Sequence, residues 1–213
     1  MNVPEQVEGR LPMLGVLVSG RGSNLEAIFD AIDRGELRAR VGVVLSSKAD
    51  APALEHATHR GIATVVIAPK QYASRAAEGE AIVEALRAAM VDLVVLAGYA
   101  RIFDPCVVQA FPLRILNIHP SLLPSFAGGM APRPQREALE AGVKISGCTV
   151  HFVTEDVDAG PIVAQAAVPV LDDDTVATLA ERILEAEHQL LPQAIGRVLS
   201  GRVRLAGKRA SVE

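Results

Sequence analysis

The chain alternates short, wholly apolar runs with segments in which apolar residues recur every third or fourth position. The short runs predict buried strands, and the recurring pattern predicts helices with one apolar face. Strands are predicted over residues 13–19, 40–46, 64–67, 92–98, 113–119, 145–154 and 161–170. Helices are predicted over residues 23–35, 51–61, 74–90, 136–142 and 174–201.

This alternation predicts an α/β fold. Strands that are apolar along their whole length are typical of a parallel sheet covered by helices on both faces. We expect one domain over residues 13–200, preceded by a polar, flexible stretch at 1–12. The polar segment 201–213 is expected to be a mobile tail or a marginal edge strand. Residues 121–135 carry no periodicity and predict a long loop, of the kind that is often functional or mobile.

Composition narrows the class of protein. Half of the 213 residues are hydrophobic, only 3% are aromatic and none is Trp, so the core must be aliphatic. The net charge of −4 does not favour broad binding to nucleic acid or to a membrane surface. It is compatible with a local pocket that binds a phosphate. No apolar run is long enough to predict a transmembrane helix.

The cysteine and histidine residues bear on the redox environment of the protein and on metal binding. The two cysteines, Cys106 and Cys148, lie far apart and form neither a disulfide framework nor a zinc spacing. A reducing, cytoplasmic setting is therefore expected. No His and carboxylate residues show the spacing of metal ligands, so no metal is expected.

The stretch "SGRGSN" at 19–24 joins the first predicted strand to the first predicted helix. Its glycines allow a tight turn, and Ser23 with the first helical amides could hold an anion such as a monophosphate. It lacks the third glycine of a dinucleotide motif and the Gly-Lys pair of a Walker A loop. An ordinary strand-to-helix turn with a Ser or Asn cap explains it equally well.

Asn117 and His119 end the predicted strand at 113–119 and lie on one face of it, because side chains alternate along a strand. Open parallel sheets bind ligands beyond the carboxyl ends of their strands. There an Asn amide and a His could stabilise a developing oxyanion and move a proton. The alternative is a core Asn with a His that caps a loop.

Other polar residues are open to two interpretations. In "TEDVDAGP", Asp156 and Asp158 could orient an imidazole or a water, or could belong to a solvated turn. Arg75 and Arg101 could meet a carboxylate or phosphate, although a surface ion pair is the default. His151 is expected to be structural or supporting, and Glu187 to lie on the surface. The residues alone thus leave open a group transfer at a carbonyl carbon and plain binding of a phosphorylated ligand.

Four motifs, "SGRGSN", "LAGYARIF", "ILNIHPSLLPSF" and "GCTVHFVTEDVDAGP", resemble the folate-dependent phosphoribosylglycinamide formyltransferases of purine synthesis. The resemblance runs from about residue 13 to residue 199. It implies a Rossmann-like, mostly parallel sheet with helices on both faces, followed by C-terminal strands and a long helix. It also implies a cis peptide before Pro124.

The resemblance implies a role for each matching residue. Asn117, His119 and Asp158 would be catalytic: Asn117 and protonated His119 would stabilise the oxyanion, and Asp158 would orient His119. The phosphate of the ribonucleotide would be bound by Gly22, Ser23 and Asn24, and its glycinamide or ribose part by Glu187. The folate would be bound by Arg75, Ala100, Arg101, Ile102, Phe103, Asn117, Thr154, Glu155, Asp156, Val157 and Asp158.

The implied reaction moves the formyl group of 10-formyltetrahydrofolate, a co-substrate, to the amine of glycinamide ribonucleotide, without a metal. The implied partners are these small molecules alone, and the protein would be a monomer or a homodimer. A formyltetrahydrofolate deformylase and a non-catalytic phosphosugar-binding module stay as alternatives. The first normally has an N-terminal regulatory domain, and only about a dozen residues precede the first strand. The stretch "SFAGGMAPRPQREALE" departs from the family pattern. The resemblance therefore does not predict how this loop closes or which of its residues contact the outer part of the folate.

Overall fold

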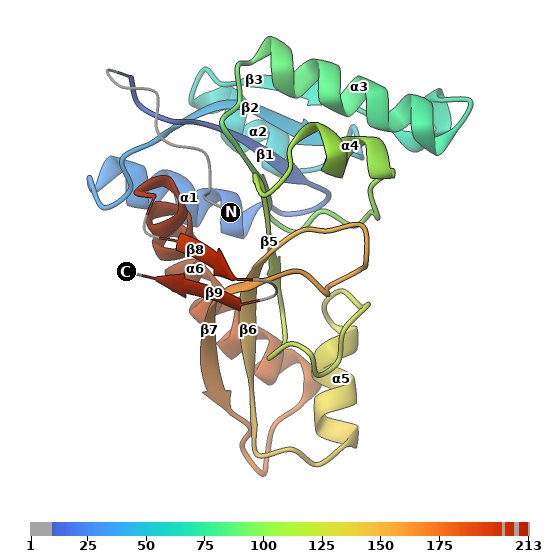
Figure 1. Cartoon of the computed structure of the whole chain (residues 1–213). Coiled ribbons are helices and arrows are strands. Elements are labelled where there is room, and N and C mark those ends of the chain that lie inside the picture. The colour runs from blue at the N-terminus through green and yellow to red at the C-terminus, as the bar shows by residue number, and fades with distance from the viewer. Residues whose placement is uncertain (1–9, 202, 207–208, 213) are drawn as a thin grey trace.

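A computed structural model describes residues 10–201, 203–206 and 209–212 of the chain. Its centre is one mixed sheet of nine strands in the order β3-β2-β1-β4-β5-β6-β7-β9-β8 (Figure 1). The strands are β1 (Met13–Val18), β2 (Arg40–Ser46), β3 (Ala63–Val66), β4 (Leu93–Leu96), β5 (Ile115–His119), β6 (Ile145–Phe152), β7 (Ile162–Pro169), β8 (Val203–Ala206) and β9 (Arg209–Val212).

Helices cover both faces of the sheet. They are α1 (Ser23–Asp33), α2 (Ala53–His59), α3 (Arg75–Ala88), α4 (Pro105–Ala110), α5 (Arg133–Glu140) and α6 (Val176–Leu199), with a 3₁₀ turn, η1 (Pro69–Gln71). The larger apolar cluster joins the sheet to α1, α2, α5 and α6, and the smaller one joins it to α3 and α4. The predicted α/β fold with helices on both faces is confirmed.

The first five strands are parallel, and their order reverses at β1 and β4. The chain moves outward from β1 through β2 to β3 and then returns to β4 on the other side of β1. This reversal opens a crevice at the carboxyl ends of β1 and β4, where such sheets bind ligands. β5, which carries Asn117 and His119, ends at the same edge.

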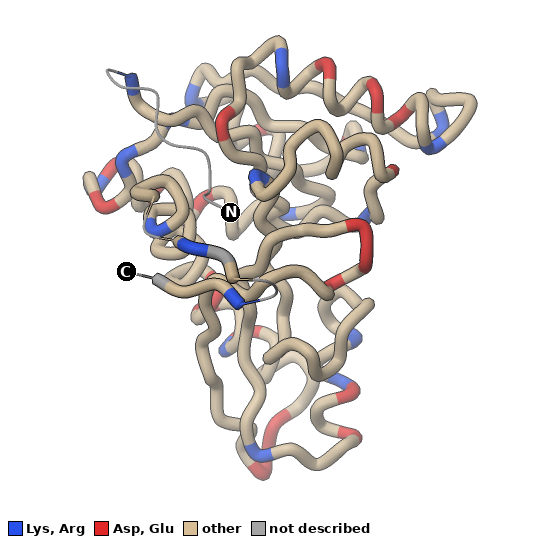
Figure 2. Tube along the Cα trace, viewed as in Figure 1, with Lys and Arg blue, Asp and Glu red and all other residues tan. Residues whose placement is uncertain are grey.

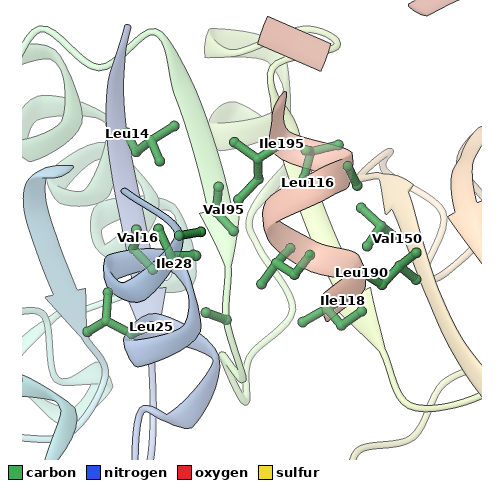
Figure 3. Packing of buried hydrophobic residues seen from close by; sticks show 14 of the residues in the cluster. Leu14, Val16, Leu25, Ile28, Val95, Leu116, Ile118, Val150, Leu190 and Ile195 are labelled. Carbon is green, nitrogen blue, oxygen red and sulfur yellow. The ribbon is translucent and has the colours of Figure 1, made fainter. Parts of the chain in front are cut away.

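The sheet becomes antiparallel at β6. β6 pairs with β5 in a register that sets His151 opposite Asn117 and Thr149 opposite His119. Leu116 and Ile118 point to the other face of β5, where they join the apolar cluster that includes α6 (Figure 3). Since alternate residues of β5 face opposite sides, the strand is anchored by two apolar residues and presents two polar ones.

The structure differs from the sequence expectations at short elements. α4 was not predicted, because a six-residue helix that begins with proline shows too little periodicity. α5 begins at Arg133, three residues before its predicted start. The tail contains a hairpin, and β9 extends the sheet next to β7. Most of the stretch expected to be flexible, residues 1–9, lies outside the described residues. Within the described part of the chain, no helix is both long and apolar enough to cross a membrane.

Candidate active site

A cavity of about 420 Å³ lies at the carboxyl edge of the sheet. Its wall is built from the segment after β4, the end of β5, the loop before α5, and the connection from β6 to β7. Asn24 of α1 and Glu187 of α6 also line it, so the cavity reaches the loop that follows β1. Figure 2 shows acidic positions on the β6–β7 connection.

Four polar side chains meet in this cavity. Nδ1 of His119 lies 3.3 Å from Oδ2 of Asp158, and Nε2 of His151 lies 3.5 Å from Oδ1 of the same carboxylate. Nδ2 of Asn117 lies 3.1 Å from Nε2 of His151. The structure therefore brings together the predicted trio Asn117, His119 and Asp158, and it adds His151.

The protonation of this cluster is set by burial and by charge. Burial lowers the pKa of His119 below its usual value, and the nearby Asp158 charge and the Phe126 carbonyl offset only part of this. Burial raises the pKa of Asp158, but the neighbouring His151 ring, the Gly128 amide that donates to the carboxylate and the nearby His119 bring that pKa below its usual value. An ionised Asp158 beside an uncharged His119 is thus the favoured state near neutral pH.

The loop before α5 closes over the cluster. The carbonyl oxygen of Phe126 lies 3.2 Å from Nε2 of His119, and the amide of Gly128 donates to Oδ2 of Asp158 at 2.8 Å. Asp158 itself has a φ of 52°, a left-handed conformation that costs a non-glycine residue about 1–3 kcal/mol unless its surroundings hold it. The atypical loop therefore contacts the two central residues of the site. The expected cis peptide before Pro124 is present.

The turn from β1 into α1 depends on Gly22. This residue, the N-cap of α1, has a φ of 88°, and a Cβ there would press against Ala53. The backbone can therefore turn at this point only with glycine. Ser23 follows as the first helical residue, and the free amides of the first turn attract anions. Asn24, which is buried, joins this turn to the cavity.

Glu187 lies beside this turn and not on the surface. Its side chain is only 6% exposed, and Nδ2 of Asn24 donates to its Oε2 at 2.7 Å. Burial raises the pKa of Glu187 to about 7, against the opposing effect of the Asn24 hydrogen bond. Oδ1 of Asn24 is buried and has no partner among the described residues. The expectation of a surface position for Glu187 is wrong, because the residue falls on the apolar stripe of α6 with Ile183 and Leu191.

The residues expected to bind folate mostly line the outer part of the cavity. These are Arg75, Ala100, Arg101, Ile102, Phe103, Thr154, Glu155 and Val157. Asp156 is exposed and does not line it. Arg101 donates to both carboxylate oxygens of the buried Glu78, at 3.0 and 2.8 Å, whereas Nε of Arg75 lies 3.9 Å from Asp104. Arg75 is thus the freer of the two cations.

His151 is the residue that sequence reasoning undervalued. The alternation in "TVHFVT" sets Thr149 and His151 on one face of β6, and the strand lies antiparallel to β5. The role of His151 follows from the pairing of the polar faces of β5 and β6. It can be predicted only if the two strands are known to be neighbours. Among the described residues, no group of three or more His, Cys, Asp or Glu side chains is arranged to hold a metal ion.

Known proteins share both the sequence and the fold. A family model described as formyl transferase matches residues 14–195. The phosphoribosylglycinamide formyltransferase of Haemophilus influenzae is 41% identical over 94% of this chain and 93% of its own length. The crystal structure of glycinamide ribonucleotide transformylase 1 from Symbiobacterium toebii has a TM-score of 0.92 and 50% identity, covering 98% of each chain.

Two further similarities mark the limits of the comparison. The bovine trifunctional purine biosynthetic protein adenosine-3 is 47% identical over 93% of this chain, but the chain spans only 19% of that relative. A formyltetrahydrofolate deformylase from Pseudomonas syringae has a TM-score of 0.88 at 24% identity, so it shares the fold.

Proposed function

The chain belongs to the formyl transferase family, and from this premise we propose that it transfers a formyl group from 10-formyltetrahydrofolate to the amine of glycinamide ribonucleotide. The products are formylglycinamide ribonucleotide and tetrahydrofolate. The observation that carries the proposal is the joint placement of Asn117, His119 and Asp158 in a cavity that Asn24 and Glu187 also line.

The amine of the ribonucleotide attacks the formyl carbon, and the carbonyl oxygen gains negative charge as the tetrahedral intermediate forms. An N–H of Asn117 and the imidazole of His119 stabilise this charge. Burial lowers the pKa of His119, so its ring can take up a proton as negative charge develops next to it. Asp158 stabilises the imidazolium through its contact with Nδ1.

Proton transfer completes the reaction. The attacking nitrogen must lose a proton, and N10 of the folate must gain one before the C–N bond breaks. His119 can hold a proton next to the reacting atoms, and Asp158 keeps its ring in one orientation. The net result is one C–N bond formed, one C–N bond broken and no net change in protons.

Different residues around the cavity would bind the two substrates. The turn at Gly22–Ser23 and the first amides of α1 would hold the phosphate, since a helix N-terminus attracts anions. The unpartnered Oδ1 of Asn24 and the protonatable Glu187 would bind hydroxyl or amide groups of the ribonucleotide. The exposed guanidinium of Arg75 would meet the carboxylates of the folate, whose ring system would lie along Ala100–Phe103.

The products of the reaction distinguish the proposed transferase from a deformylase and from a binding module. A deformylase would release formate from the same folate without consuming the ribonucleotide, and a binding module would release nothing. The experiment is an absorbance assay of folate conversion, with and without glycinamide ribonucleotide, followed by mass analysis of the products. Formylated ribonucleotide supports the proposal, whereas formate alone, or no turnover by folded protein, rejects it.

We also propose a cellular compartment and an oligomeric state for the protein. Both cysteines are unpaired, Cys106 half-buried and Cys148 buried, which suits the reducing cytoplasm. The cavity is lined within a single chain, so a monomer would suffice, and a homodimer is equally compatible with it.

A further inference from the structure

His151 is the last but one residue of β6 and is only 2% exposed. Each of its ring nitrogens meets a specific atom. Nδ1 lies 2.9 Å from the carbonyl oxygen of Phe152, and Nε2 lies 3.1 Å from Nδ2 of Asn117. A buried imidazole with both nitrogens engaged is held in one orientation, so these contacts define what the ring can do.

The contact with Phe152 determines where the ring carries its proton. A carbonyl oxygen can only accept a hydrogen bond, so Nδ1 of His151 must donate to it. In an uncharged ring the other nitrogen then has no hydrogen and can only accept. Nε2 therefore accepts a hydrogen bond from the amide of Asn117. Nε2 lies farther from Oδ1 of Asp158, at 3.5 Å, than from Nδ2 of Asn117.

This contact also determines which way the Asn117 amide faces. Its NH₂ group is turned toward His151, and one of its two hydrogens is used there. The second hydrogen is left for the cavity, which Asn117 lines next to His119. If the amide were rotated by half a turn, its oxygen would face the Nε2 lone pair and its NH₂ group would move away. His151 disfavours that rotated state.

We propose that His151 is a positioning residue, whose Nε2 accepts a hydrogen bond from Asn117 and thereby directs the second N–H of Asn117 at the carbonyl oxygen of the formyl group. The inference deepens the proposed function and rests on it. His151 itself does not touch the reacting atoms. It acts before the reaction, because the amide is already oriented when the substrate arrives, and preorganised donors stabilise a developing oxyanion most effectively.

A double-mutant cycle on kcat tests the inference. His151→Leu fills the buried position with an apolar side chain and removes the acceptor of the Asn117 hydrogen bond. We expect kcat to fall by about 10- to 100-fold, with little change in KM for either substrate. Asn117→Ala should cost about 10²- to 10³-fold. In the Asn117→Ala protein, His151→Leu should cost less than about threefold, because the amide it would position is gone. Independent, multiplicative losses would overturn the proposal.

A conservative variant separates positioning from packing. The side-chain oxygen of Gln reaches the place of the imidazole Nε2, so His151→Gln should recover most of kcat. His59→Leu, at an exposed position of α2, is the matched control and should leave kcat unchanged. Equal loss in the Gln and Leu variants would contradict the role of the acceptor.

A measurement without turnover keeps this inference distinct from the proposed function. Nitrogen-15 NMR of the free protein should show the His151 ring protonated on Nδ1 and unprotonated on Nε2. The Asn117 side-chain amide signals should shift in His151→Leu and not in His59→Leu. If His151 carries its proton on Nε2, the inference is wrong even if formyl transfer is observed. If the pattern is as expected but no formyl transfer occurs, the proposed function is wrong and the orientation of Asn117 stands.

Discussion

Nδ1 of His119 lies 3.3 Å from Oδ2 of Asp158, although one residue ends β5 and the other belongs to the connection between β6 and β7. β6 runs antiparallel to β5 and ends at Phe152, opposite Leu116, and the connection that follows it carries Asp158 to His119. The contact places an anion beside a buried imidazole and joins the antiparallel half of the sheet to the ligand crevice of the parallel half.

Neutralising this anion should impair the reaction and leave the fold intact. In Asp158→Asn the carboxamide is similar in size but has no charge to stabilise the imidazolium. We expect kcat to fall by about 10²- to 10⁴-fold, in the range seen when the carboxylate partner of a catalytic histidine is neutralised. Steady-state kinetics measure this, with calorimetry to show that ribonucleotide binding persists. Asp172→Asn, at an exposed ion pair with Lys144, is the control. A loss below about fivefold would contradict the role of Asp158.

The acid side of the pH–rate profile should report His119. Because burial lowers its pKa, the rate should rise with pH through a value below about 6.5 and then level off. Asp158 raises the pKa of His119, so the acid limb should move to still lower pH in Asp158→Asn. The pH dependence of kcat for the two proteins gives the comparison. An acid limb that moves to higher pH in the variant would show that another group controls it.

Glu187 should make the free protein less stable as pH rises. Its pKa is raised from 4.5 to about 7, so between these values the folded chain holds a proton that the unfolded chain has lost. The resulting penalty is absent below about pH 4.5, grows between the two values and is constant above about pH 7, at an order of 3 kcal/mol. Glu187→Gln keeps an acceptor for Asn24 and removes the penalty.

Urea unfolding of the free protein at pH 5 and pH 8 measures this difference. The variant should gain more stability over the unmodified protein at pH 8 than at pH 5, while its affinity for the ribonucleotide falls. An equal gain at the two pH values would show that Glu187 is already ionised in the free protein.

Two glycine variants should shift stability in opposite directions. At Gly160 a Cβ would overlap the carbonyl group of Phe152, so Gly160→Ala should lower the free energy of unfolding by more than about 2 kcal/mol. Gly196 lies within α6, where a Cβ would meet only Leu37 at an ordinary contact distance of 3.8 Å. Gly196→Ala should therefore raise stability by about 0.5–1 kcal/mol. Chemical denaturation tests both, and a stabilising Gly160→Ala would contradict the packing described.

The sequence predicted the parallel half of the fold well, because its strands are wholly apolar and its helices strongly periodic. The position of Asn117 and His119 on one face followed from strand alternation alone. The partners that complete the site did not follow from it. Asp158 and His151 reach His119 and Asn117 only through the antiparallel pairing of β5 with β6, which a single sequence does not reveal.

Glu187 was misjudged for another reason. An acidic residue on a helix is usually exposed, but this one occupies the apolar stripe with Ile183 and Leu191. A carboxylate within such a stripe signals a buried, protonatable group, and reading the stripe residue by residue would have found it. The role of Arg101 depended on Glu78, a buried partner in the first turn of α3, which no local pattern indicates.

The most direct test of the central claim is formyl transfer by His119→Ala, measured beside ribonucleotide binding. The unmodified protein should convert 10-formyltetrahydrofolate and glycinamide ribonucleotide to formylglycinamide ribonucleotide. The variant should lose at least about 10³-fold in kcat and keep nearly the same affinity for the ribonucleotide, because the contacts proposed for its phosphate and sugar do not include His119. Transfer that survives the change intact would show that His119 is not the group that handles the proton.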